Sequence, residues 1–520
     1  MTTTSALELQ HHSLADFIEA TLAKFAEKPA FSCLGQTLSF AEIEQKSRAL
    51  ACFLQEHPAI NAGDRIAIQL PNLIQYPIAA YGALRAGLVL VNTNPLYTPR
   101  EMQHQFKDSG AKVLVILEDL LPKFDAIKSE TEVELVITTK APDLLMPDAK
   151  DAPQGCTSLN AILTDYHSQT LLKRPTVSGD DNCVLQYTGG TTGVSKGACL
   201  SHHNVIANAV QVFERLDDKC IEGEETFVCP LPLYHIYAFT VNMVMFFSRG
   251  SLNVLIPNPR DLDAFVNQIK PFQFTGFSGI NTLFVGLCHH PAFKTLDFSK
   301  LKLTISGGTA LTSSAVDIWK QVTSCSITEG YGLSETSPVL CFNTPDHEVL
   351  GSVGKPLVGT EIELWNDKDE VAEEGQIVAR GPQVMSGYWN MPDETAKVMK
   401  DGFFKTGDVG IRLDSGEIKI VDRLKDMIIV SGFNVYPNEV EDVLTKHNSI
   451  LEAAVIGEPD DKTGEKVAAY ITIEASVTAE EVIEHCRAHL TAYKVPKKVV
   501  VLDELPKSTV GKILRRELRK

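Results

Sequence analysis

A repeated alternation of short apolar runs with longer amphipathic segments restricts the fold of this chain more than any other feature. Residues 73–87, LIQYPIAAYGALRAG, have the spacing of a helix and lie between runs rich in Ile, Val and Leu. Strands that alternate with helices in this way form parallel sheets covered on both faces. The sequence therefore predicts an α/β fold with doubly wound, mostly parallel sheets. The expected strands are 64–70, 111–117, 133–139, 181–188 and 301–308, and the last two precede expected helices at 201–216 and 312–322.

The pattern changes after about Gly410, where the segments resemble those of a small α+β domain. Residues 416–432 read as a pair of strands, and Thr478 and Glu481 have the spacing of a capping box at the start of a helix. A chain of 520 residues also exceeds what one hydrophobic core accommodates. We therefore expect two unequal domains with the active site in the cleft between them. Their expected bounds are 1–424 and 425–520.

Composition restricts the partners and the compartment. The formal net charge of −18 argues against a nucleic-acid partner, because phosphate binding needs Lys and Arg in excess. The eleven cysteines include no CxxC pair, which is typical of a reduced, cytoplasmic protein with buried thiols. The N-terminus lacks the pattern of a secretory signal, and the most apolar segment, 238–247, is about half the length that spans a bilayer.

The segment 188–204, TGGTTGVSKGACLSHHN, gathers glycines, hydroxyl side chains and Lys196. Glycine lets a ligand approach the main chain closely, and backbone N–H groups, hydroxyls and an ammonium group are suitable donors for phosphate oxygens. We expect an anion-binding loop between the strand 181–188 and a helix just beyond it. The loop is not a Walker A motif, because Lys196 follows Ser195 where that motif requires glycine.

A second interpretation of the same loop is a hydrolase. Residues 193–197, GVSKG, match the GxSxG nucleophile elbow, in which Ser195 would attack an ester without ATP. The elbow follows its strand directly, whereas loop residues from Gly189 onward precede Ser195 here. The pentapeptide alone leaves an esterase or thioesterase open.

Several motifs taken in order resemble the acyl-adenylate-forming enzymes, a family that includes acyl-CoA synthetases, luciferases and peptide-synthetase adenylation domains. The resemblance covers nearly the whole chain. Further segments at 91–101, 231–240, 258–262, 279–284 and 431–439 resemble bacterial long-chain fatty-acid-CoA ligases. The motifs of the wider family are YTGGTTGVSKGA (187–198), EGYGLSET (329–336), FFKTGD (403–408), VDRLKDMIIVSGFNVYPNEVE (421–441) and PKSTVGKILRREL (506–518).

The resemblance implies ATP and coenzyme A as substrates, with Mg²⁺ held by Glu335 and a further metal contact at Thr188 left open. Ser334 would touch the α-phosphate, Asp408 the ribose hydroxyls with help from Arg423, and Tyr331 the adenine. Ser334 departs from the pattern, since many relatives carry Thr there. The remaining residues assigned to the nucleotide are Gly189, Gly190, Thr191, Thr192, Gly193, Lys196, Gly307, Gly308, Gly330 and Gly332.

The resemblance also implies catalytic roles for Lys512, Glu335 and Thr188, with Lys512 bridging the carboxylate and the α-phosphate. Lys425 would be the hinge of a mobile C-terminal domain, and Gly432 and Phe433 would line the path of coenzyme A. A small β subdomain would complete the large domain. The acyl pocket is assigned to His235, Phe239 and Asn281.

The acid substrate is expected to be a long-chain fatty acid, while a medium-chain or aryl, cinnamate-type acid stays open because the pocket segments give no chain length. Glu335 and Lys512 argue against a protein that only binds acyl-adenylates, because a binding protein without catalysis would need neither residue. Peripheral contact with the inner face of the cell membrane and assembly as a homodimer also stay open, since no segment demands either.

Overall fold

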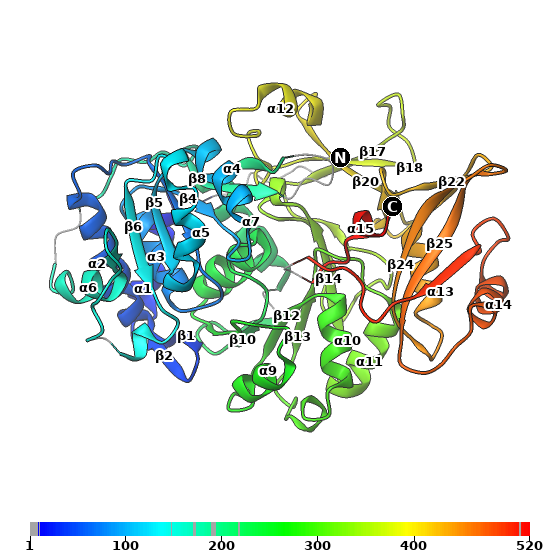
Figure 1. Ribbon diagram of the computed structural model, residues 1–520, viewed down its shortest axis with the longest axis horizontal. Coiled ribbons are helices and arrows are strands. Elements are labelled where there is room, and N and C mark those ends of the chain that lie inside the picture. Colours follow the sequence, from blue (N-terminus) through cyan, green and yellow to red (C-terminus); the bar gives the residue numbers. More distant parts are fainter. Residues whose placement is uncertain are drawn as a thin grey trace.

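The computed structural model of the chain describes residues 9, 11–146, 148–169, 173–188, 194–216, 219–508 and 511–519. Figure 1 shows two large sheets with their helices, a smaller sheet beside them, and a separate C-terminal unit in orange and red. The prediction of an α/β fold with parallel sheets and a smaller C-terminal domain is confirmed.

The first large sheet has, within the described residues, seven strands in the order β7-β6-β5-β3-β4-β8-β9. Neighbouring strands are parallel except for the pair β8 and β9. The strands are β3 (Arg65–Gln69), β4 (Val89–Asn92), β5 (Ala111–Leu117), β6 (Leu135–Thr139), β7 (Thr157–Ser158), β8 (Asn182–Thr188) and β9 (Lys196–Ser201).

The second large sheet has, in the same described part, nine strands in the order β16-β15-β14-β13-β12-β10-β11-β1-β2. Its central strands are parallel, and antiparallel strands close both edges. The strands are β1 (Pro29–Cys33), β2 (Gln36–Ser39), β10 (Thr226–Cys229), β11 (Leu252–Leu255), β12 (Gly276–Gly279), β13 (Leu303–Ser306), β14 (Ile327–Gly332), β15 (Val339–Phe342) and β16 (Lys355–Pro356).

Helices cover both faces of the sheets. Along β3, Ile66 and Ile68 belong to one apolar cluster and Ala67 to another, so both faces of the strand are buried. The helices are α1 (Leu14–Lys24), α2 (Phe40–Glu56), α3 (Gln75–Arg85), α4 (Pro99–Ser109), α5 (Leu121–Asp125), α6 (Leu159–Asp165), α7 (His202–Leu216), α8 (Ile236–Ala238), α9 (Leu262–Ile269), α10 (Asn281–His289), α11 (Ser313–Thr323) and α12 (Pro392–Val398).

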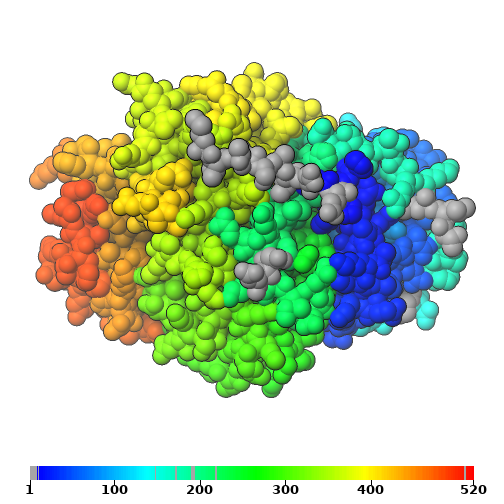
Figure 2. All heavy atoms as spheres, turned by 180° about the vertical axis from the view of Figure 1, so that it is seen from behind, coloured from blue at the N-terminus to red at the C-terminus, as the bar shows by residue number. Residues whose placement is uncertain are grey.

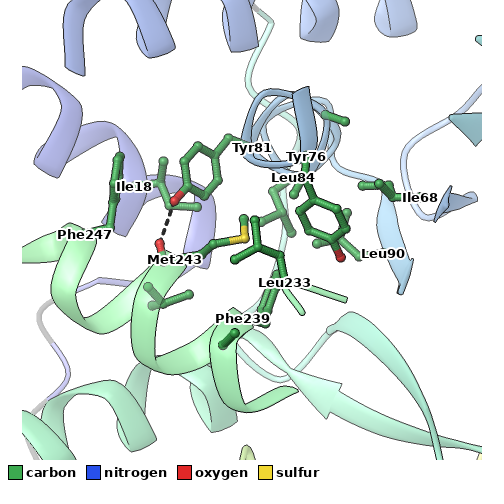
Figure 3. Close-up of a cluster of buried hydrophobic side chains, with 14 of the residues drawn as sticks. Ile18, Ile68, Tyr76, Tyr81, Leu84, Leu90, Leu233, Phe239, Met243 and Phe247 are labelled. Atoms are coloured by element: carbon green, nitrogen blue, oxygen red, sulfur yellow. Dashed lines mark hydrogen bonds between the residues drawn. The ribbon is translucent and has the colours of Figure 1, made fainter. Parts of the chain in front are cut away.

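The two large sheets share one hydrophobic core. Figure 3 shows Tyr81 of α3 beside Met243 of η5 (Phe239–Phe246), a helix of π type, with Tyr76 of α3 and Phe239 of η5 in the same apolar cluster. The Tyr81 hydroxyl donates to the Met243 carbonyl at 2.6 Å, which satisfies both polar groups inside the core. The apolar segment 238–247 is therefore a buried helix between the sheets. In the described residues no helix combines the length and apolar character needed to cross a bilayer.

The third sheet joins the large domain to the small one. It consists of β17 (Glu361–Trp365), β18 (Glu374–Arg380), β19 (Met399–Lys400), β20 (Phe403–Arg412) and β21 (Ile418–Arg423). The two strands expected at 416–432 are present, but they belong to different sheets: β21 pairs with β20, whereas β22 (Ile428–Val430) pairs with β23 and β25. A turn containing Lys425 separates β21 from β22.

The small domain has its own sheet and its own apolar clusters, formed by residues from Ile428 onward. Thr478 and Glu481 form the expected capping box at the start of α14. The elements after β22 are β23 (Phe433–Val435), α13 (Pro437–Leu444), β24 (Ile450–Asp460), β25 (Gly464–Ile473), α14 (Ala479–His489), β26 (Lys498–Val501) and α15 (Arg515–Leu518).

Candidate active site

The site lies where the two large sheets meet. β8 ends at Thr188, and η7 (Ser334–Thr336), which follows β14, packs against β8 and β9. Because β13 and β14 are parallel neighbours, the turn after Ser306 lies beside the last residues of β14. Residues that the resemblance assigned to the nucleotide therefore come from both sheets to one region.

The anion-binding loop connects two strands of a hairpin. Thr188 pairs with Lys196, and β9 continues to Ser201 before α7 begins at His202. The helix expected at 201–216 is α7, and what the sequence did not predict is the strand β9 between the loop and this helix. His104 Nε2 lies 2.8 Å from the Ser195 carbonyl oxygen and ties the loop to α4. Gly189, Gly190, Thr191, Thr192 and Gly193, which were assigned to the phosphates, lie outside the described residues.

Ser195 does not occupy a nucleophile elbow. An elbow places its serine in a sharp turn between a strand and a helix. Here Ser195 is followed at once by the strand β9, and the contact of His104 is with its backbone oxygen. The hydrolase interpretation therefore has no support from the local geometry.

Lys196 has a protein partner that the sequence did not indicate. Its ammonium group forms an ion pair with Glu394 of α12 and lies 5.1 Å from the centre of the Tyr388 ring. Hydrogen bonds from Lys196 and Lys397 lower the pKa of Glu394 to about 2, so its carboxylate is charged at neutral pH. A phosphate at the loop would have to compete with this carboxylate for Lys196.

Glu335 is a buried carboxylate with a neutral partner. Its side chain belongs to η7, is 8% exposed, and accepts a hydrogen bond of 2.8 Å from the Tyr388 hydroxyl. Burial raises the pKa of Glu335. A buried carboxylate with spare lone pairs suits a hard cation such as Mg²⁺, which commonly binds one or two carboxylates together with substrate phosphates. In the described part of the chain no group of three or more His, Cys, Asp or Glu side chains could hold a metal ion.

Asp408 lies at the junction of the second and third sheets. Arg423 Nε is 3.1 Å from its Oδ1, and the Tyr331 hydroxyl donates to its Oδ2 at 2.7 Å. Asp408 is 4% exposed. Each carboxylate oxygen keeps a free lone pair, since an ionised carboxylate accepts about four hydrogen bonds. These two oxygens could accept the paired hydroxyls of a ribose.

The turn after β13 leaves room for a ligand. Gly308 has φ +83°, and a Cβ at this position would have nothing within 4 Å, so the main chain here faces open space. The buried hydroxyls of Ser306 and Thr309, on either side of the turn, have no hydrogen-bond partner among the described residues. Orphaned buried donors beside an open backbone suit a polar ligand such as a nucleotide. Nearby on β14, burial raises the pKa of Glu329 to about 8, a feature that the sequence did not predict.

Lys512 reaches this site from the small domain. It lies in a tight turn in which Ser508 Oγ accepts from the Lys512 N–H at 3.1 Å. Burial and then the neighbouring charge of Arg423 lower its pKa to about 8. Lys512 also interacts electrostatically with Asp408 and His235, so one cation from the small domain meets groups from the large domain.

The residues assigned to the acyl pocket lie in different settings. His235 caps α8, where its Nδ1 accepts from the Tyr237 N–H at 3.3 Å, and burial lowers its pKa to about 4. Phe239 lies in the shared core and is 1% exposed. Asn281 Oδ1 accepts from the N–H and hydroxyl of Thr312, which joins α10 to α11.

The residues assigned to coenzyme A lie on the small domain. Gly432 has φ +84° and open space at its Cβ position, and Phe433 is 58% exposed. The Phe433 ring stacks on Tyr493, with 5.0 Å between ring centres. The pair provides an exposed aromatic surface beside a backbone that a narrow ligand can approach.

Comparison with known proteins supports the same family assignment over nearly the whole chain. Residues 18–389 match the model of a family described as AMP-binding enzyme, and residues 439–512 match the AMP-binding enzyme C-terminal domain. The chain is 43% identical to a long-chain-fatty-acid–CoA ligase of Yersinia pestis, with 98% of this chain and 94% of that protein covered. It is 42% identical, with the same coverage, to the enzyme of that name from Salmonella typhimurium (strain LT2).

The fold also matches a solved structure. The crystal structure of the anthranilate CoA ligase AuaEII in complex with anthranoyl-AMP superposes with a TM-score of 0.91 at 24% identity, over 98% of this chain and 97% of that one. At 24% identity, this structural similarity supports the fold alone. Together with the two family models, which span both domains, these matches show that the chain belongs to the AMP-binding enzyme family.

Proposed function

We propose that the protein ligates a long-chain fatty acid to coenzyme A through an acyl-adenylate. The observation that carries the proposal is Lys512, a half-buried lysine of the small domain that interacts electrostatically with Asp408 and Arg423 of the large domain. The relatives named long-chain-fatty-acid–CoA ligase support a long alkyl acid over an aryl one, since the anthranilate ligase is the more distant at 24% identity.

In the first half-reaction, a carboxylate oxygen of the fatty acid attacks the α-phosphorus of ATP. A mixed anhydride forms and pyrophosphate leaves. Both reactants are anions, so the site must offset charge and hold the two in line. Lys512 bridges the carboxylate and the α-phosphate, the Ser334 hydroxyl donates to the α-phosphate, and Asp408 with Arg423 holds the ribose. Tyr331, Gly307, Gly308, Gly330 and Gly332 frame the adenine, and Thr188 and Lys196 with the loop between them hold the outer phosphates.

Glu335 is the residue that would hold Mg²⁺, together with phosphate oxygens and with Thr188 as a further contact. When bound, the ion offsets the charge of the triphosphate and of departing pyrophosphate. Tyr388 orients the Glu335 carboxylate through its hydroxyl. Lys196 exchanges its partner Glu394 for a phosphate oxygen when the nucleotide enters.

In the second half-reaction, the thiolate of coenzyme A attacks the acyl carbon, the thioester forms, and AMP leaves. We propose that the small domain, residues 425–520, rotates about Lys425 after pyrophosphate departs. Gly432 and Phe433 then line the path of the pantetheine arm, and the acyl chain lies near His235, Phe239 and Asn281. Movements of this kind assemble successive sites in many enzymes.

The test is consumption of the coenzyme A thiol by the purified protein with ATP and Mg²⁺. Acids from acetate to palmitate and oleate, together with cinnamate, are compared beside a control without ATP. We expect ATP-dependent loss of thiol that is greatest with long alkyl acids. A maximum at medium-chain acids or cinnamate would reassign the substrate. Thioester or ester cleavage without ATP that is abolished by Ser195→Ala would overturn the ligase.

We propose a cytoplasmic location with peripheral contact at the inner face of the cell membrane. None of the eleven cysteines, all of which lie in the described residues, forms a disulfide, and ten of them are buried, which suits a reducing compartment. A long alkyl acid partitions into lipid, so contact with a bilayer would shorten its route to the site. Co-sedimentation with lipid vesicles tests this contact. The assembly of the protein as a homodimer is a separate proposal, which sedimentation velocity tests.

Tyr388→Phe should raise the Mg²⁺ concentration needed for half-maximal adenylation about tenfold, because partners that orient a metal ligand contribute on this scale. The ring that lies against Lys196 is kept, so the apparent KM for ATP should change little at saturating Mg²⁺. Pyrophosphate release measured over a range of Mg²⁺ checks this. Direct titration of the nucleotide-loaded protein with Mn²⁺, followed by electron paramagnetic resonance, should show the same weakening; equal curves for both proteins would remove Tyr388 from the site.

The pH dependence of adenylation should reflect the protonation state of Lys512. Because its pKa in the free enzyme is lowered to about 8, kcat/KM for pyrophosphate release should fall as the pH rises through that value and the ammonium group loses its proton. Lys512→Arg keeps a permanent charge. The variant should be slower at neutral pH and should lose this alkaline decline, and an unchanged decline would assign it to another group.

A further inference from the structure

At three places, described residues of the small domain accept hydrogen bonds from parts of the large domain that are far from the hinge in the chain. Asp442 of α13 accepts from Ser313, the Gly511 carbonyl accepts from Thr282 at 3.1 Å, and the Ser508 carbonyl accepts from Arg260 at 3.2 Å. Figure 2 shows, from behind, the orange surface of the small domain adjoining the surface of the large domain. These contacts fix one relative orientation of the two domains.

Asp442 makes the strongest of these contacts, because it is the only carboxylate among the three acceptors. Its Oδ1 accepts from the Ser313 N–H at 3.1 Å and from the Ser313 hydroxyl at 2.9 Å. Ser313 is the first residue of α11, an 11-residue helix whose N-terminal N–H groups and dipole attract an anion. Lys446 lies 2.8 Å from Oδ2 and orients the carboxylate from the other side.

The charge of Asp442 is maintained at this place. Partial burial acts to raise its pKa, but hydrogen bonds from Lys446 and Ser313 outweigh that effect and the pKa is lowered. The side chain is therefore an anion at neutral pH. Hydrogen bonds to an ionised acceptor are about twice as strong as those between neutral groups.

The same surface of the large domain also holds the turn that carries Lys512. Asn281 joins the start of α10 to Thr312, the N-cap of α11, and the next residue, Thr282, donates to the Gly511 carbonyl. Ser313 and Thr282 thus belong to one rigid platform formed by the starts of two helices. Asp442 and the residue before Lys512 contact this platform together.

We propose that Asp442 is a positioning residue that latches the small domain in the orientation needed for adenylation. The proposal rests on the proposed two-step function. Rotation about Lys425 must break the contact, because Asp442 and Ser313 belong to the two parts that move and are 129 residues apart. By contrast, Arg515 and Asn438 bind Asp422, only three residues before the hinge, where rotation displaces atoms least.

The experiment measures the two half-reactions of Asp442→Asn separately. Pyrophosphate release in a single turnover reports adenylation, and synthetic palmitoyl-adenylate with coenzyme A reports thioester formation. We expect adenylation to slow about tenfold, in the range of couplings between conformational states, and thioester formation to be unchanged or faster. Glu480→Gln is the matched control, since it removes an exposed carboxylate from α14 of the same domain and should alter neither step.

A second variant protects the test against a folding defect. Ser313→Ala removes one of the two hydrogen bonds and should give a smaller loss of adenylation alone. In the double variant the loss should equal that of Asp442→Asn, as expected for partners in one contact. Equal losses in both half-reactions, or no loss of adenylation in either variant, would overturn the latch. Failure of the proposed function is separate, because the unaltered protein would then release no pyrophosphate with any acid.

Discussion

Lys512→Ala should slow adenylation by about three orders of magnitude. In the proposed mechanism, the ammonium group of Lys512 neutralises charge between two anionic reactants. Removing one such group from a site that excludes water typically costs 10²–10⁵-fold, with about 10³ expected here. Burial, the largest cause of its lowered pKa, also reduces the screening of the group by water. Pyrophosphate release in a single turnover measures the loss.

The same variant should form the thioester from supplied palmitoyl-adenylate within about threefold of the normal rate, because the proposed rotation of the small domain would turn Lys512 away from the acyl carbon in the second step. Lys507→Ala is a suitable control. It removes a lysine of the same segment that pairs with Glu452 inside the small domain. A comparable loss of both half-reactions in Lys512→Ala would mean that Lys512 serves the structure of the domain.

Glu335→Gln should slow adenylation about 10²-fold and should not lower the melting temperature. The amide is isosteric and can still accept from Tyr388, but it lacks the charge that would hold a divalent ion at the proposed site. The ionised carboxylate is buried, so its removal also removes a desolvation cost, and the fold should be as stable as before or more stable.

Initial rates over a range of Mg²⁺ and thermal unfolding of the two proteins check this prediction. Excess Mg²⁺ should restore little of the rate. If the variant instead unfolds at a lower temperature while the activity of the folded fraction is normal, Glu335 is a structural residue of η7.

The sequence predicted the parallel sheets well because that signal is local and repeated. Both faces of β3 and its neighbours are buried, and such strands are recognised from their composition alone. The strand β9 was missed because the same local signal is weak there. The apolar run after Lys196 is too short for its sequence to distinguish a strand from the start of the next helix, and it is a strand because it pairs with β8.

The partners of the site residues could not be predicted, because they depend on contacts between distant segments. Glu394 is 198 residues from Lys196, and Tyr388 is 53 residues from Glu335. The segment that carries both partners has no motif that indicates a role. Asn281 shows the converse: its motif suggested an acyl pocket, while its side chain joins two helices. Only the folded arrangement reveals which side chain faces which.

The shared core between the two large sheets has a consequence for how the molecule comes apart. Residues of β3, α3, η5 and β13 belong to one apolar cluster, so separating the sheets would expose most of that core at once. In the part of the chain that the structure describes, the small domain buries its own apolar residues and contributes none to this cluster. The large domain should therefore melt as one cooperative unit, whereas the small domain can undock intact, and a nucleotide that contacts both would make their transitions coincide.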